Sequence, residues 1–311
     1  EARTMTAAVL ADSPAGNSVA TLRTDSYEHA HALTVLLDSL VFDWLLRTRV
    51  VGPNLNWFLL EECAAPVLAQ GLREATECSV LATLTAPVFS TQAVRLAAYW
   101  SSSKLLLTER ARSARRARVD AIAALYFGMD VGAFRYVLQS VDLPRERLAS
   151  ESAGLDPEGF WRVDKDKDPE LRHTVLTLVA FHDLEEKIRA CGGDRDAGIE
   201  AFLGQNEGEG WMLPETLRLA DYGLGHDERA KQLQLVASRL GPRFYDWQLA
   251  QSAEESWREC HLHARNLLGE QGYRELLEEI AARERGEETT GASTPRTSRA
   301  DPRRAKQQGL W

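Results

Sequence analysis

The sequence predicts a mainly helical protein of the α+β class, in which a small N-terminal β element is followed by helical bundles and a disordered C-terminal tail. Three observations support this class. Apolar side chains recur at helical spacing within the first fifty residues, helix start and stop signals recur between residues 168 and 284, and residues 286–311 are rich in Thr, Ser, Pro, Gly and Arg. We therefore divide the chain into residues 1–150, residues 151–285 and a tail at residues 286–311.

The β element is predicted at the N-terminus. Two short runs, residues 5–10 and 18–22, flank residues 12–17, which combine Asp, Ser, Pro, Gly and Asn. These residue types favour turns because their side chains or their φ angles suit a reversal of the chain. The pattern predicts a hairpin or a pair of strands.

A helix is predicted next, with one continuous apolar stripe. The stripe recurs every three or four residues along Leu33, Leu36, Leu37, Leu40, Val41, Trp44 and Leu45. Arg47 and Arg49 close this helix, because cations are favourable at the negative end of the helix dipole. Gly52-Pro53-Asn54 then predicts a turn into a short apolar run at residues 55–60.

Residues 91–126 predict a further helix, which carries five arginines between residues 110 and 118. Gly128 is its expected C-terminal stop, because glycine readily adopts the left-handed conformation that ends many helices. A short amphipathic helix is expected over residues 131–141. The Ser, Gly and Pro content of residues 150–159 indicates a domain boundary near residue 150.

The second half is predicted to be almost entirely helical. A helix begins at Asp168-Pro169-Glu170, where a capping carboxylate precedes a proline in the first turn, and it ends at Gly192-Gly193. Further helices are expected at residues 195–203, 226–240, 246–268 and 271–284.

The net charge of -9 is unevenly distributed. Residues 1–150 hold 15 Lys and Arg against 15 Asp and Glu, whereas residues 151–285 hold 17 against 28. Because phosphate contacts need cations, the second block is a poor candidate for binding a polyanion, and the first block is the better candidate provided that its cations cluster. The longest apolar stretch, residues 33–46, contains two aspartates and is too short for a bilayer, and the four cysteines are scattered. We expect a reduced, cytoplasmic protein without a membrane partner.

Motifs for catalysis or cofactor binding are missing from the sequence. It contains no dinucleotide-binding glycine loop, no P-loop, no nucleophile elbow and no Asn-Pro-Pro-Tyr tetrapeptide. The alternating acids at residues 164–168 lack the glycine and glutamate of a calcium loop, and Cys260-His261-Leu262-His263 lacks a second ligand cluster. Glu185-Glu186-Lys187 lacks the partner acid of a nuclease site. The sequence predicts no catalytic residue, no cofactor-binding residue and no metal ligand in this chain.

Two segments are candidates for DNA contact. The first combines two arginines at a helix end with two asparagines and a tryptophan beyond a Gly-Pro turn, namely Arg47, Arg49, Asn54, Asn56 and Trp57. Arginines suit phosphates and asparagines suit base edges. Alternatively, the asparagines satisfy the backbone of the turn and the tryptophan belongs to the core.

The second candidate is the arginine run itself. It consists of Arg110, Arg112, Arg115, Arg116 and Arg118. Such a run either follows a phosphate backbone or forms a solvated helix face.

The first candidate segment also carries a family resemblance. Residues 40–58, LVFDWLLRTRVVGPNLNWF, resemble a phrase in large adenine-specific DNA methyltransferases, namely the type IIG restriction–modification fusions and the related methylases of the BREX and DISARM phage-defence systems. In that family the phrase lies in the target-recognition region. Residues 3–9 with 16–18 resemble the strand pair before it, and residues 117–128 with 134–138 resemble the helix pair after it. Residues 159–165 and 219–227 resemble C-terminal phrases of the defence-associated members, so the resemblance extends in patches over residues 1–270.

The resemblance implies a function for a larger protein. In this family the S-adenosylmethionine-binding glycine motif and the catalytic Asn-Pro-Pro-Tyr motif lie N-terminal to these phrases, and both are missing here. Because the sequence also begins with Glu1 rather than Met, we expect it to be the C-terminal part of a longer chain. The parent would use S-adenosylmethionine to methylate adenine N6 on an extruded base, and this part would position double-stranded DNA and help to select its sequence.

Other subunits of the defence system are further expected partners. The alternative function is that of a non-enzymatic helical module that docks a protein, with residues 151–285 as its acidic surface.

Overall fold

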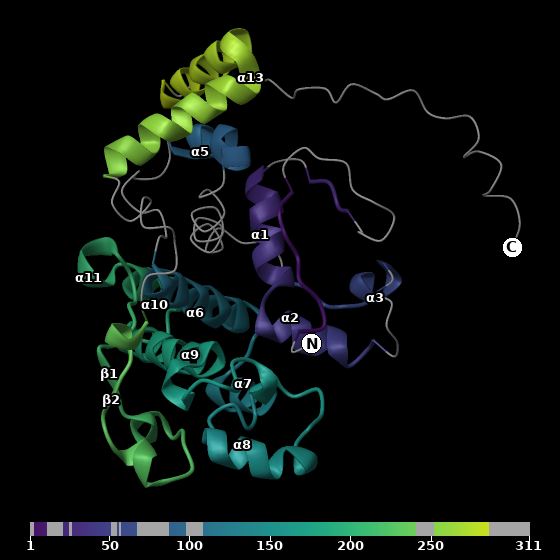
Figure 1. The fold of residues 1–311 in the computed structure, drawn as a ribbon, viewed down its shortest axis with the longest axis vertical. Coiled ribbons are helices and arrows are strands. Elements are labelled where there is room, and N and C mark those ends of the chain that lie inside the picture. Colours follow the sequence, from purple (N-terminus) through teal and green to yellow (C-terminus); the bar gives the residue numbers. More distant parts are fainter. Residues whose placement is uncertain are drawn as a thin grey trace, which may run out of the picture.

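The computed structural model describes residues 3–10, 21–24, 27–50, 55, 57–66, 87–97, 108–240 and 252–285, and over these ranges the chain is mainly helical (Figure 1). The mainly helical class predicted from the sequence is therefore confirmed. The predicted tail at residues 286–311 lies outside the described residues. The helices run over α1 Tyr27–Leu37, α2 Leu40–Arg47, α3 Trp57–Glu61, α5 Ser90–Ala97, α6 Glu109–Tyr126, α7 Val131–Val137, α8 Arg145–Glu151, α9 His173–Ala190, α10 Arg195–Leu203, α11 Gln205–Gly208 and α13 Ala253–Glu284.

A two-stranded antiparallel sheet is present, but it lies in the second half of the chain. It pairs β1 (Thr216–Leu217) with β2 (Gln234–Leu235). Residues 3–10 and 21–24, the described parts of the predicted N-terminal β element, contain no strand. The reason is that carboxylates take the place of a partner strand: Asp43 accepts from the Thr4 N–H at 2.8 Å and Asp38 accepts from the Ala7 N–H at 2.7 Å.

The predicted helix over residues 33–46 is divided in two. α1 and α2 meet at a bend of 60° at residues 38–39. Ser39 causes the restart, because its backbone is extended and its hydroxyl oxygen accepts from the Phe42 N–H at 3.2 Å, as an N-cap does. The Leu40 N–H donates to the buried Asp120 carboxylate at 2.9 Å, which fixes the start of α2 on α6. Among the described residues no single helix could cross a membrane, and only this bent pair passes by length and composition.

The core is built around α6 and α9, which lie along each other (Figure 1). Its buried apolar side chains extend from Leu40 in α2 to Ala237 near β2. α10 packs very closely on α9, since a Cβ at Gly198 would lie 2.6 Å from the Cα of Ile188. One core thus crosses residue 150, where the sequence predicted a boundary.

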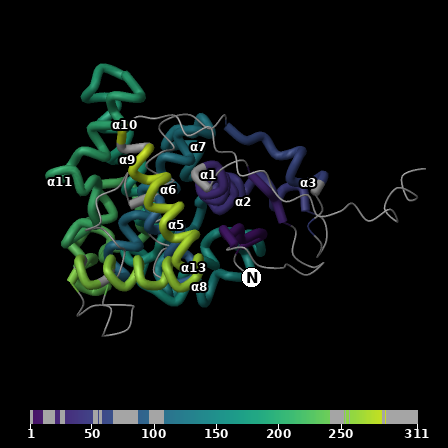
Figure 2. The backbone as a smooth tube through the Cα atoms, turned by 90° about the horizontal axis from the view of Figure 1, so that it is seen from above, coloured from purple at the N-terminus to yellow at the C-terminus, as the bar shows by residue number. Residues whose placement is uncertain are grey.

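α5 and α13 form a second, smaller core. α5 lies against α13 (Figure 2). Val94 of α5 and Ala264 and Leu276 of α13 are buried together. α13 contains a break at Gly269, whose φ of 71° is left-handed. The described parts of the predicted helices 246–268 and 271–284 are thus confirmed as two helical stretches.

Four further predictions on helices have different outcomes. The helix at residues 195–203 is confirmed as α10, and the left-handed Gly128 follows α6 as predicted. The helix predicted from Asp168 begins only at His173, because the extended Arg172 aims its buried guanidinium at the Val141 and Leu143 carbonyls, at 2.6 and 2.7 Å. The prediction of a helix at residues 226–240 is wrong, because this segment is divided between short 3₁₀ turns and β2.

Candidate nucleic-acid interface

Arg47 lies at the end of α2 and is held by three groups. It pairs with the buried Asp43 at 2.8 Å, donates to the Glu158 carbonyl, and places its guanidinium 3.9 Å from the centre of the Phe160 ring. Only 9% of its side chain is exposed. Arg47 therefore connects α2 to the segment around residue 160, and little of its charge faces solvent.

A small pocket of about 160 Å³ lies beside this contact. Its walls come from α2, from the end of α7 and from the turn before Phe160. They are formed by Trp44, Arg47, Thr48, Val137, Gln139, Asp156, Glu158, Gly159 and Phe160. At this pocket residues 40–58 meet residues 159–165, two of the segments for which a family resemblance was described (the family-like phrases).

The remaining candidates of the first segment are only partly described. Arg49 donates to the Leu45 carbonyl at 2.8 Å and so satisfies an acceptor at the end of α2. Asn54 and Asn56 lie outside the described residues, and Trp57 is the first residue of α3. For Asn54 and Asn56, base reading and turn formation therefore both stay predictions.

The arginine run lies on α6 and does not form a single face. Arg118 is buried at 3% exposure and donates to the Glu209 carbonyl at 2.8 Å. Arg110 pairs with Glu215 at 2.7 Å. Both side chains thus point to the segment that connects α11 with β1, and their contacts are structural.

Three arginines of the run lie on another side of α6. Arg116 is exposed, and Arg112 and Arg115 are half-buried. Positions 112, 115 and 116 are spaced by three and four residues, so their side chains project from one side of the helix. Of the five arginines in the run, these three share this side of α6.

A buried polar pair lies beneath this side of α6. The Nε2 of His173 lies 2.7 Å from the Asp120 carboxylate, and both side chains are almost fully buried. Burial and the charge of Arg116 lower the pKa of His173 despite its bond to Asp120. Burial alone would raise the pKa of Asp120, but the hydrogen bond from His173, the charge of Arg3 and the hydrogen bond from the Leu40 N–H bring it below its ordinary value. The pair is therefore a neutral imidazole that donates to a carboxylate, and it joins α6 to α9.

The sequence did not predict an ion-pair network at the start of α9. Glu170 is fully buried and accepts from Arg229 at 2.6 and 3.0 Å and from Arg239 at 2.8 Å. Asp168 also pairs with Arg239, at 2.6 Å. Roughly sixty residues separate the partners, so no local pattern could have indicated these pairs.

The family-like phrase at residues 219–227 has structural contacts as well. The Gly225 N–H donates to Asp142 at 2.6 Å, and His226 lies 3.1 Å from the same carboxylate. A Cβ on Gly225 would overlap Ala230, so this position requires glycine. The phrase therefore holds the 3₁₀ turns before β2 against the helical core.

Guanidiniums such as those on α6 can bind anionic groups, including phosphate. The candidate groups are the guanidiniums of α6, a helix that packs along α9. No protein-family model, no curated protein and no solved structure matches the chain.

Proposed function

We propose that this chain is the C-terminal, DNA-positioning part of a site-specific adenine-N6 DNA methyltransferase of restriction–modification or phage defence. The observation that carries the proposal is the order of the family-like phrases along the sequence, from residues 3–9 to residues 219–227. The parent protein would contribute the S-adenosylmethionine site and the catalytic residues. This segment would contact double-stranded DNA and help to choose its sequence.

Packing of the phrases against one another supports the proposal. Arg47 of residues 40–58 lies on Phe160 of residues 159–165, and Asp142, which follows residues 134–138, accepts from the N–H of Gly225 in residues 219–227. Phrases that are far apart in sequence but share contacts belong to one framework, as expected if they came from one family. Such a framework holds α6 rigidly and presents Arg112, Arg115 and Arg116 from one side of it.

Phosphate binding is assigned to these three arginines. They share one side of α6 and keep solvent-facing surface, whereas Arg118 and Arg47 are nearly enclosed and Arg110 turns toward Glu215 on another side of the helix. A guanidinium that binds phosphate increases affinity for every sequence alike. Removal of one such guanidinium therefore reduces the slope of log K against log salt by about 0.9.

The test is a gel shift with the whole chain and mixed-sequence duplex at low salt. Replacement of Arg112, Arg115 and Arg116 by Ala should weaken binding to all sequences and reduce the salt slope. The control replaces Arg147, Arg218 and Arg258, which removes the same charge from solvent-facing positions elsewhere. Equal effects of the two triple variants would show a diffuse charge effect and contradict the proposed interface.

A protein-docking module is the second candidate function. It is favoured by the apolar side chains that α13 exposes, namely Leu262, Leu267, Leu268 and Leu277. A chain that binds no duplex in the gel shift would favour this function over DNA positioning.

A further inference from the structure

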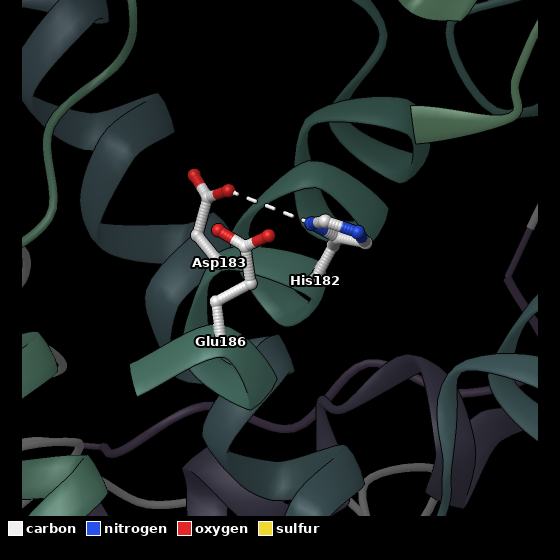
Figure 3. Close-up of side chains that lie close together, drawn as sticks. All are labelled: His182, Asp183 and Glu186. Atoms are coloured by element: carbon white, nitrogen blue, oxygen red, sulfur yellow. Dashed lines mark ion pairs between the residues drawn. The ribbon is translucent and has the colours of Figure 1, made fainter. Parts of the chain in front are cut away.

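Three potential metal ligands lie on one side of α9, apart from the arginines. His182, Asp183 and Glu186 turn their polar atoms toward one another (Figure 3). One ligand atom from each lies within 4.8 Å of the other two. Residues 182 and 186 are four apart and residues 183 and 186 three apart, so the helix itself brings Glu186 beside both partners.

The imidazole of His182 supplies an unused donor atom to this cluster. Its Nδ1 is buried and has no hydrogen-bond partner in the described part of the chain. The nearest carboxylate oxygen, Oδ1 of Asp183, is 3.8 Å away, which is too far for a hydrogen bond. A buried polar atom without a partner is costly, so a ligand for this nitrogen would stabilise the site.

The distances suit a bound cation better than direct contact between the side chains. Zinc–ligand bonds to imidazole nitrogen and carboxylate oxygen are about 2.0–2.2 Å, which places two ligands of a tetrahedral ion about 3.4 Å apart. The observed separation of 3.8 Å and the overall spread of 4.8 Å need only small rotations of side chains to reach this geometry.

Groups from a neighbouring segment already orient two of the ligands. The indole N–H of Trp211 donates to Oδ2 of Asp183 at 2.8 Å, and the Tyr222 hydroxyl also bonds this carboxylate. The Tyr222 ring lies edge-on to the His182 ring, with 5.1 Å between their centroids. Outer groups of this kind fix the direction of metal ligands and raise affinity.

We propose that His182, Asp183 and Glu186 bind a zinc ion. One imidazole and two carboxylates form a donor set that zinc accepts, whereas magnesium and calcium prefer oxygen ligands alone. Arg189 lies 3.9 Å from Glu186, but both side chains are more than half exposed, so a divalent cation displaces this weak pair. Three protein ligands leave a fourth position for water or for a ligand from a partner.

The experiment is a zinc titration of the full chain after removal of metals by a chelator, followed by isothermal calorimetry. We expect one zinc per chain. The double variant His182→Gln/Glu186→Gln should lose at least about 100-fold in affinity, and Tyr222→Phe, which removes only an outer hydrogen bond, should lose about tenfold.

A matched control is available on α13. Glu259 and His263 are also a Glu and a His four residues apart, with 3.6 Å between Oε1 and Nε2. The double variant Glu259→Gln/His263→Gln removes the same residue types and should leave zinc affinity unchanged.

Three outcomes would overturn the proposal. They are the absence of zinc binding by the unchanged chain, equal binding by the His182→Gln/Glu186→Gln variant, and a cobalt(II) spectrum with a thiolate charge-transfer band, which would place the ion on cysteine. Circular dichroism of the metal-free variants checks their fold. If the double variant is unfolded, Glu186→Gln decides instead, because the Glu186 side chain is 57% exposed.

Discussion

Replacement of Glu170 by Gln should destabilise the protein through the ion pairs that hold the segment before β2. Glu170 is fully buried, and its two oxygens accept three hydrogen bonds from Arg229 and Arg239. Gln keeps the shape but removes the charge and turns an amide NH₂ toward a guanidinium. Two cations then face a neutral group.

The expected loss in the free energy of unfolding depends on how deeply Glu170 and its two arginine partners are buried. Loss of one partner of a buried ion pair costs about 3–5 kcal/mol. Here the two arginine side chains are 38% and 37% exposed, so water solvates them partly after the change. Asp168 also still pairs with both arginines. We therefore expect a loss of about 2–3 kcal/mol in the free energy of unfolding.

Urea denaturation at pH 7, followed by far-UV circular dichroism, measures this loss as a lower midpoint with an unchanged m value. The control is Glu151→Gln, which removes an exposed carboxylate from its pair with Arg147 on α8 and should leave the midpoint unchanged. A midpoint for Glu170→Gln equal to that of Glu151→Gln would refute the reasoning, because it would mean that burial adds nothing to these pairs.

Two further predictions concern packing and pH. Gly198→Ala should cost about 1–3 kcal/mol in the free energy of unfolding, because the new methyl overlaps the Ile188 backbone. Gly154→Ala is the control, because its new methyl meets nothing within 4 Å. Equal urea midpoints of the two variants would contradict the close approach of α9 and α10. The hydrogen bond from Arg239 lowers the pKa of Asp168 from its ordinary 3.8. The ionised Asp168 therefore stabilises the fold at neutral pH, and this stabilisation is lost as the pH falls below about 4 toward the lowered pKa. Thermal melts from pH 7 to pH 2.5 should show a smaller acid loss in Asp168→Asn, and identical pH profiles would contradict this assignment.

Local signals in the sequence predicted much of the fold. The bounds of α10 and the stop at Gly128 rest on caps and glycines whose effect is confined to a few residues, and both are confirmed. The break at Ser39 was not predicted, because the apolar stripe continues through it. What divides the helix is the Ser39 cap together with Asp120, which lies 80 residues further along the chain.

The candidate interface was predictable only as a set of residues. Spacing along α6 shows which arginines share a side of the helix, but it does not show which side packs on the core. Burial of Arg118 depends on its contact with Glu209, 91 residues away. The pattern His-Asp-x-x-Glu at residues 182–186 is visible in the sequence, but its outer partners Trp211 and Tyr222 become apparent only in the fold.

The pairing of α5 with α13 has a consequence for the synthesis of this chain. Arg95 of α5 bonds Glu279 of α13 across 184 residues of sequence. At about 5–20 residues per second, a ribosome needs roughly 10–40 s to make that interval. During this time the apolar side of α5, with Val94, has left the ribosome without its partner helix. The second core can therefore close only when translation of the described chain is almost complete, and α5 stays without this partner until then.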